Sequence, residues 1–255
     1  MRYVLLLLLA LMISASVSAA EPDYRLWQEL LSKHYDPAKG MNYTRLKADK
    51  ATLDRLRQQM AAVDVASLSR PEQLAYWINL YNISTVAVVV ENYPVKSIRD
   101  ISTDPIVRLN VFKKPYVKVK GGTMSLNDVE NDKIRAGFKD PRIHFAINCA
   151  AESCPPIRPE PFVGASIEHQ LNDQTRRFLE GPNGVRFEQN LEVLQLHVTK
   201  IMDWFKDDFE QWGGGSIVFL KKHLPSNKVR RIEAAGRSVK LSFDDYDWRL
   251  NDTSL

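Results

Sequence analysis

Three side chains of types that work together in thiol enzymes lie close together in the sequence: Glu130, His144 and Cys154. A thiol beside an imidazole has a lowered pKa, and its thiolate attacks carbonyl or disulfide centres while the imidazole acts as a base. A carboxylate or carboxamide orients the imidazole in such sites, and Glu130 or Asn148 could supply that group. We therefore take Cys154 as the candidate nucleophile, His144 as the candidate base and Glu130 as a candidate orienting group.

The residues just before this thiol alternate as in a β-strand. In a strand over residues 142–149, Arg142, His144 and Asn148 share a polar face, whereas Cys149 lies on the opposite, core face. A guanidinium, an imidazole and a carboxamide then stand in one row, which makes Arg142 and Asn148 candidate ligand-binding residues. The turn that follows could bring the candidate nucleophile back toward His144.

Two other interpretations of the cysteines stay open. Cys149 and Cys154 are five positions apart, and such a pair in an exported protein often forms a structural disulfide or stays as inert thiols. A metal ion could instead be held by Cys154, His144 and Glu130. The sequence has no His-Glu-x-x-His motif and no closely spaced Cys/His set, so we expect neither a metal nor a cofactor.

A long buried helix is expected upstream of these residues. Ser69 and Glu72 form a capping-box pattern around Pro71, which predicts a helix that runs to about Tyr93, just before Pro94. The spacing of its apolar residues places Trp77 and Tyr81 in the core.

Two amides interrupt the apolar sequence of this helix. Asn79 and Asn82 are three residues apart and therefore share a helix face. Buried amides must be hydrogen-bonded. They either bond loop backbone and fix the fold, or they form the floor of a pocket, so both are candidate binding residues.

The remaining patterns predict an α+β fold in one domain over residues 20–255, with helices packed around a modest mixed or antiparallel sheet. Helices are expected over 24–34, 45–63, 126–137 and 166–180, and over 199–223 on both sides of a glycine run. Hairpins are expected over 114–126 and 184–198, and a last pair of short strands over 229–243.

Residues 1–19 have the order of a secretory signal peptide, in which Arg2 precedes an apolar run and small residues. We expect cleavage to leave Ala20 or Glu21 at the N-terminus and the mature protein to be periplasmic or secreted. The apolar run is too short to span a bilayer, so no transmembrane span is expected after cleavage. The formal net charge is only +4, and acidic residues are interspersed with the basic ones, so we expect no nucleic-acid partner.

Several motifs of the chain resemble those of the domain-of-unknown-function 547 family (DUF547). They lie at residues 76–82, 93–98, 125–130, 140–146, 153–155, 207–209 and 246–251, with Cys149 between two of them. The family pattern often has His where this chain has Asn131, so a role for that histidine does not carry over. The resemblance implies a widespread, mostly bacterial and often exported domain without a settled activity.

Glu130, His144 and Cys154 fall in these family motifs, and this arrangement is similar to that of the catalytic residues of a Cys/His enzyme. One hypothesis is therefore a thiol-dependent hydrolase or acyl transferase. The alternative is a non-catalytic binding domain with a structural disulfide, whose ligand is a small molecule, a peptide or a component of the cell envelope.

Overall fold

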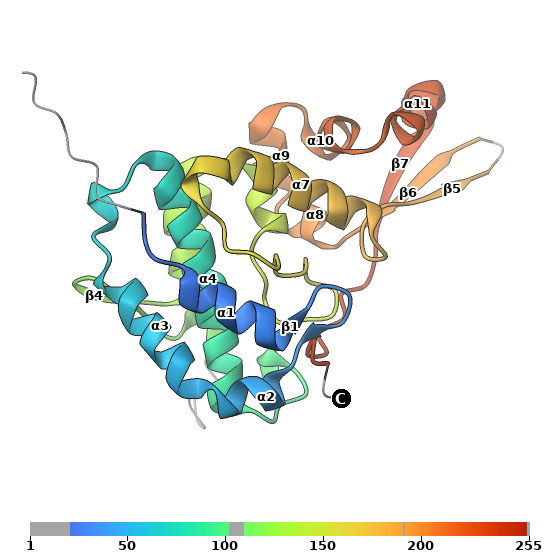
Figure 1. Ribbon diagram of the computed structural model, residues 1–255. Coiled ribbons are helices and arrows are strands. Elements are labelled where there is room, and N and C mark those ends of the chain that lie inside the picture. The colour runs from blue at the N-terminus through green and yellow to red at the C-terminus, as the bar shows by residue number, and fades with distance from the viewer. Residues whose placement is uncertain (1–20, 102–109, 191, 254–255) are drawn as a thin grey trace, which may run out of the picture.

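Helix α4 (Arg70–Asn92) runs through the middle of the molecule (Figure 1). The capping box between Ser69 and Glu72 is formed, with the Ser69 N–H donating to Glu72 Oε2 at 2.7 Å. Trp77 and Tyr81 are buried, as predicted from their spacing. The computed structural model describes residues 21–101, 110–190 and 192–253, and the expected signal peptide lies outside them.

Short helices cover one side of α4. The helix predicted over 45–63 is divided at Asp49 into α2 (Tyr43–Ala48) and α3 (Lys50–Ala62), and α1 (Arg25–His34) packs against both. A two-residue ladder, β1 (Tyr35–Asp36) and β2 (Gly40–Met41), joins α1 to α2. Short 3₁₀ turns connect this part to the rest: η1 (Val65–Ser67), η2 (Ile98–Asp100) and η3 (Val111–Lys113).

The predicted hairpin forms as β3 (Val117–Val119) and β4 (Gly122–Met124), and Ser125 caps the helix that follows. This helix consists of three segments: α5 (Leu126–Asp128), the π-helix η4 (Val129–Arg135) and α6 (Ala136–Phe138). The wide π turns change the direction of side chains within an otherwise continuous helix, and such turns are frequent at functional sites.

The strand predicted over 142–149 is wrong. Pro141–Phe145 forms the 3₁₀ helix η5, because the Asp140 side chain accepts a hydrogen bond from the Arg142 N–H and caps the turn. The alternation of polar and apolar residues that suggested a strand arises from burial of this segment. Ile143 packs in one apolar core and Phe145 in a second, so this segment is buried on both sides.

The second core lies between the C-terminal helices and a three-stranded sheet. This part contains η6 (Gly164–Ser166), α7 (Ile167–Glu180), β5 (Arg186–Gln189), β6 (Leu194–Val198), α8 (Ile201–Trp204), α9 (Lys206–Gly213), α10 (Gly215–His223), α11 (Ser226–Ala235), η7 (Gly236–Ser238) and β7 (Val239–Phe243). β6 pairs antiparallel with β5 and parallel with β7, so the sheet is mixed. The α+β class is confirmed.

The strand pair predicted over 229–243 is half wrong, because α11 occupies the first part and only β7 is a strand. Ile232 is buried and Val229 packs beside it in the second core, while the charged residues between them face outward. A spacing of three residues places both side chains on one face of a helix but on opposite faces of a strand, so their burial in one core favours the helix.

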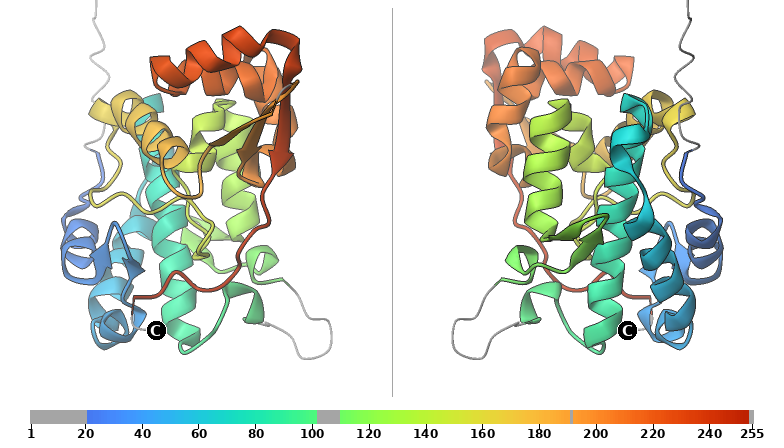
Figure 2. Two further views of the ribbon diagram at one scale, coloured as in Figure 1. Left: turned by 90° about the vertical axis from the view of Figure 1, so that its right-hand side faces the viewer. Right: turned by 90° about the vertical axis from the view of Figure 1, so that its left-hand side faces the viewer.

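After β7 the chain leaves the sheet and crosses the molecule toward α2 (Figure 2). We call residues 244–253 the C-terminal strap. Its backbone accepts hydrogen bonds from Glu152 and Ser153, and the Asn251 N–H donates to the Ala150 carbonyl at 3.1 Å. No helix among the described residues has the length and apolar character to cross a membrane.

Candidate functional site

A pocket of about 190 Å³ opens between α4, the π-helix η4 and the C-terminal strap. Six of its fifteen described lining residues are Phe, Tyr or Trp, and the lining contains both cysteines. The lining residues are Tyr81, Asn110, Phe112, Asn127, Glu130, His144, Ile147, Cys149, Cys154, Pro155, Ile201, Trp204, Phe205, Tyr246 and Trp248. The structure therefore places Glu130, His144 and Cys154 in the lining of one pocket.

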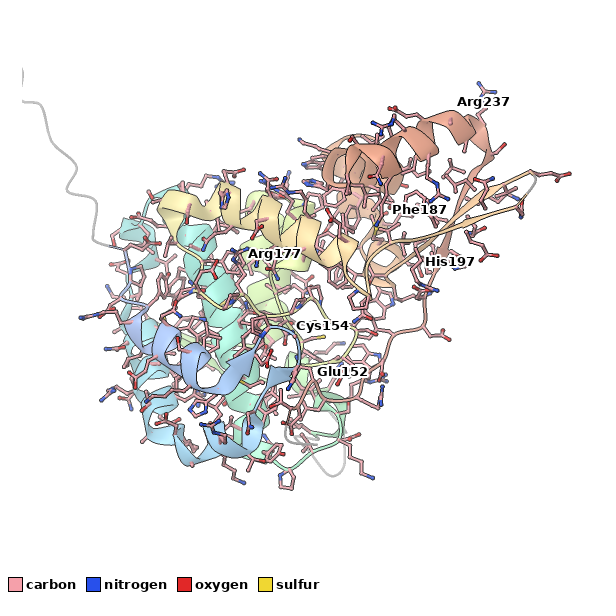
Figure 3. The ribbon with its side chains drawn as sticks, turned by 45° about the vertical axis from the view of Figure 1, so that its right-hand side comes forward. Glu152, Cys154, Arg177, Phe187, His197 and Arg237 are labelled. Atoms are coloured by element: carbon pink, nitrogen blue, oxygen red, sulfur yellow. The ribbon has the colours of Figure 1, made fainter. Side chains whose placement is uncertain are left out.

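The loop after Ile147 returns on itself, but it carries Cys154 to Cys149 rather than to His144. The two sulfur atoms are 2.9 Å apart, longer than the ~2.05 Å of a disulfide bond, so both thiols are free. The Cys149 N–H also donates to Cys154 Sγ at 2.8 Å. Cys154 lies in the interior, where the helical body meets the sheet that carries His197 (Figure 3).

Backbone geometry produces this return. Ala150 has a φ of +62°, a left-handed conformation that is uncommon for a residue with a side chain. Asn148 stabilises the turn, since its Oδ1 accepts from the Ala150 N–H at 2.8 Å and its Nδ2 donates to the Pro155 carbonyl at 2.7 Å. Asn148 therefore stabilises the loop of residues 148–155, which we call the thiol loop, and it does not line the pocket.

The two thiols have opposite electrostatic environments. The hydrogen bond from Cys154, aided by the Tyr246 hydroxyl 3.2 Å away, lowers the pKa of Cys149. Burial raises the pKa of Cys154 well above its usual value, and a neighbouring Cys149 thiolate raises it further. Cys149 is partly exposed while Cys154 is only 8 % exposed, so the expectation of Cys149 on a core face is wrong. Cys149 is the more accessible thiol of the pair and the one whose pKa is lowered.

Glu130 faces the same pocket from the π-helix. Burial raises the pKa of this carboxyl to about 7, although the Arg135 charge and the Tyr81 hydroxyl act to lower it. The Tyr81 hydroxyl lies 3.5 Å from Glu130 Oε2. A carboxyl that titrates near neutrality can both give and take a proton under physiological conditions. Glu130 therefore suits proton transfer better than orientation of His144, with which it has no hydrogen bond in the described chain.

His144 is oriented by a partner that the sequence did not suggest, Asp208 of α9. Asp208 Oδ2 lies 2.7 Å from His144 Nε2, and the Arg135 guanidinium bonds the same carboxylate through two nitrogens at 2.7 and 2.9 Å. Although burial acts to raise it, the hydrogen bonds from His144 and Arg135 hold the pKa of Asp208 well below its usual range. The Phe205 ring stacks on the imidazole, with centroids 3.9 Å apart.

These partners determine the tautomer of His144. Burial lowers the pKa of the imidazole, so the ring is neutral near pH 7. An ionised Asp208 only accepts hydrogen bonds, hence Nε2 carries the proton and Nδ1 has a free lone pair. Nδ1 is buried and has no hydrogen-bond partner within the described residues, neither sulfur included. A proton acceptor is thus held ready in the pocket wall.

The other candidate binding residues have structural partners. Asn79 bonds both backbone groups of Phe162, at 2.7 and 3.0 Å. Asn82 likewise accepts from the Asn148 N–H at 2.8 Å and donates to the Ala146 carbonyl at 3.0 Å. Both amides therefore bond loop backbone, as expected if their role is to fix the fold.

Arg142 also lies away from the pocket lining. Its guanidinium bonds Asp140, Glu168 and Asn172, which ties η5 to α7. Among the described residues, no group of three His, Cys, Asp or Glu side chains is placed to hold a metal ion.

Sequence reasoning missed Arg135 and the pocket position of Cys149 close to the candidate residues, and it missed Asp208 and Tyr246, which come from distant parts of the chain. The motifs at 207–209 and 246–251 were the available signal, because they contain an acid and a tyrosine outside any regular apolar pattern. Their contacts span 64 and 97 residues of sequence, which no local pattern encodes.

The fold and this site define an α+β protein with a pair of free thiols in an aromatic pocket. Residues 65–179 match the model of DUF547, described as a protein of unknown function, and the family resemblance is confirmed over these residues. The matched part contains Glu130, His144 and both cysteines, whereas Asp208 and Tyr246 lie beyond it. No curated protein and no solved structure gave a significant match to the chain.

Proposed function

We propose that the pocket catalyses thiol–disulfide exchange, with Cys149 as the attacking sulfur and Cys154 as the resolving one. The observation that carries the proposal is the 2.9 Å contact between a partly exposed thiol with a lowered pKa and a buried thiol with a raised pKa. The thiolate is the nucleophile in such exchange, and a second thiol within reach releases the mixed disulfide.

The reaction balances within the protein and a disulfide substrate. The Cys149 thiolate attacks one substrate sulfur, the substrate S–S bond breaks, and the other substrate sulfur leaves as a thiolate that takes up a proton. The Cys154 thiol then loses its proton and attacks Cys149 Sγ, which forms the Cys149–Cys154 disulfide and releases the second substrate thiol. Two electrons pass from the protein to the substrate, and a dithiol reductant restores the starting state.

Two groups beside the thiols support this order of reaction steps. Burial raises the pKa of Tyr246 well above its usual value, so its hydroxyl keeps its proton and donates a hydrogen bond to the Cys149 thiolate. Glu130, with a pKa of about 7 in the same pocket, can accept the proton that Cys154 loses.

A hydrolase or acyl transferase is the second candidate, and the pair of His144 and Asp208 favours it. An imidazole oriented by a carboxylate and free at its other nitrogen is the base that acyl transfer uses. The backbone around Cys149 favours thiol–disulfide exchange over acyl transfer. The N–H groups of Cys149 and Ala150, the nearest donors for an oxyanion, are already engaged by Cys154 Sγ and Asn148 Oδ1.

The test uses the reduced native protein and 5,5′-dithiobis(2-nitrobenzoate). Exchange predicts that each molecule releases two equivalents of nitrothiobenzoate and ends as an adduct-free disulfide by intact mass. Cys154→Ser should release one equivalent and retain the adduct, while Cys149→Ser should react many times more slowly. His144→Ala should leave the exchange rate nearly unchanged. Turnover is then measured as reduction of insulin by dithiothreitol, which should depend on Cys149.

The other hypotheses predict different results. A hydrolase or transferase would show a burst of p-nitrophenol from p-nitrophenyl acetate that His144→Ala abolishes, with no turnover of insulin. A binding domain would show neither activity. If both thiols react only after unfolding, the exchange proposal fails. Cellular fractionation tests the accompanying proposal that the protein is exported and works in the periplasm or outside the cell.

A further inference from the structure

Three aromatic rings form a platform at the pocket beside Cys149. Trp204, Tyr246 and Trp248 contact one another, with centroid separations of 4.8 Å for Trp204–Tyr246, 5.8 Å for Trp204–Trp248 and 4.7 Å for Tyr246–Trp248. The Arg99 guanidinium lies over Trp248, 5.0 Å from the ring centroid. Tyr246 also touches Cys149 Sγ through its hydroxyl, so the platform leads directly to the attacking sulfur.

Trp204 is the unusual member of this platform. It is 45 % exposed, and the only other large apolar side chain with comparable exposure in the described chain is Val218. Single exposed apolar residues are normal on protein surfaces. An exposed tryptophan that stacks on two further rings at the edge of a pocket instead offers a surface on which an apolar group can pack.

The rest of the lining limits the kind of group. Glu130 is the only Asp, Glu, Lys or Arg among the described lining residues, and the nearby guanidinium of Arg99 lies over Trp248 rather than in the lining. A volume of about 190 Å³ exceeds the ~150 Å³ cavity that accepts benzene. The pocket therefore has room for one uncharged aromatic or branched aliphatic side chain next to a sulfur atom.

We infer that the substrate is a peptide disulfide in which an apolar or aromatic side chain adjacent to the cysteine packs on Trp204, Tyr246 and Trp248. This inference rests on the proposed exchange reaction and names its substrate class. A small anionic disulfide such as glutathione disulfide is the competing substrate, and we expect it to react more slowly because the described pocket lining offers its carboxylates no lysine or arginine. Arg99, which lies over Trp248, could receive a carboxylate only at the platform itself.

The test compares three disulfides on the reduced protein: the disulfide dimers of acetyl-Phe-Cys-amide and acetyl-Gly-Cys-amide, and glutathione disulfide. The phenylalanine dimer should react fastest. Trp204→Ala should lower its rate by about 2- to 10-fold, the range expected for loss of an aromatic pair, and should lower the rate of the glycine dimer less, so that the preference between the two dimers falls. Trp204→Phe should restore most of the preference. Val218→Ala is the matched control, since it removes an equally exposed apolar side chain outside the pocket.

Equal rates for the two peptide dimers, or equal effects of Trp204→Ala and Val218→Ala, would overturn the inference, as would a preference for glutathione disulfide. A separate binding measurement distinguishes this failure from failure of the exchange reaction. Equilibrium dialysis of S-methylated acetyl-Phe-Cys-amide against Cys149→Ser reports on the platform without any sulfur chemistry. Binding that Trp204→Ala weakens, in a protein without exchange activity, would refute only the reaction.

Discussion

Replacement of Glu130 by glutamine should change how stability depends on pH. The folded protein holds the pKa of this carboxyl at about 7, against 4.5 for the free side chain. A group with a raised folded pKa contributes its full stability below the unfolded pKa and loses it as pH rises through the folded pKa. The native protein should therefore lose stability between about pH 4.5 and pH 7, and Glu130→Gln should not.

The magnitude follows from the size of the shift. A difference of about 2.5 pKa units at ~1.36 kcal/mol each corresponds to about 3 kcal/mol, which is an upper value because Glu130 is partly exposed to the pocket. Urea unfolding of both proteins with a reductant at pH 5 and pH 8.5 measures it. The variant should gain up to about 3 kcal/mol relative to the parent between these two pH values.

The exposed Glu152 supplies the control, because Glu152→Gln makes the same substitution outside the pocket. A stability difference between Glu130→Gln and the parent that does not vary with pH would refute the reasoning. It would mean that the carboxyl keeps a pKa near that of the free side chain in the folded protein, so that its carboxylate is too weak a base to take the proton from Cys154 efficiently.

Four further predictions concern the fold, the site and the N-terminus. Trp77→Ala should lower the free energy of unfolding by about 3–5 kcal/mol, since it removes a buried aromatic ring from α4, and a loss below about 1 kcal/mol would contradict the central place of that helix. Asn82→Ala should cost about 2–4 kcal/mol, because it leaves two buried backbone groups of the thiol loop without partners, and it should also slow disulfide formation; unchanged stability would show that water replaces the amide. Asp208→Asn should cost about 1–3 kcal/mol at pH 7 and progressively less toward pH 3, since a lowered pKa contributes stability that is lost as the carboxylate is protonated. Intact-mass measurement of protein from the host envelope should find Ala20 or Glu21 at the N-terminus, and an intact Met1 would rule out the signal peptide.

Local signals were sufficient for the helices that carry their own start and stop residues. The start of α4 followed from Ser69 and Glu72, and the helix that bears Glu130 followed from Ser125. The hairpin over 114–126 also followed from alternation and its glycine turn. In each of these elements the residues that decide the structure are neighbours in sequence, so a short segment is enough to predict the element.

The segment around His144 could not be predicted in the same way. Its alternation of polar and apolar residues reflects two cores on its two sides, and the capping interaction of Asp140 favours a 3₁₀ turn over a strand. The opposite roles of Cys149 and Cys154 depend on the left-handed backbone of Ala150 and on Tyr246, 97 residues beyond Cys149. The orientation of His144 depends in the same way on Asp208, which a helix from another core supplies.

The C-terminal strap also determines when the site can come into existence. A chain is synthesised from its N-terminus, so α4, the π-helix and both cysteines are made well before residues 244–253. Until the strap binds, Cys149 lacks the Tyr246 hydroxyl and the backbone of residues 150–153 lacks its partners at 247–251. The nascent protein therefore passes through a stage in which its two thiols stand uncovered beside a nearly complete core.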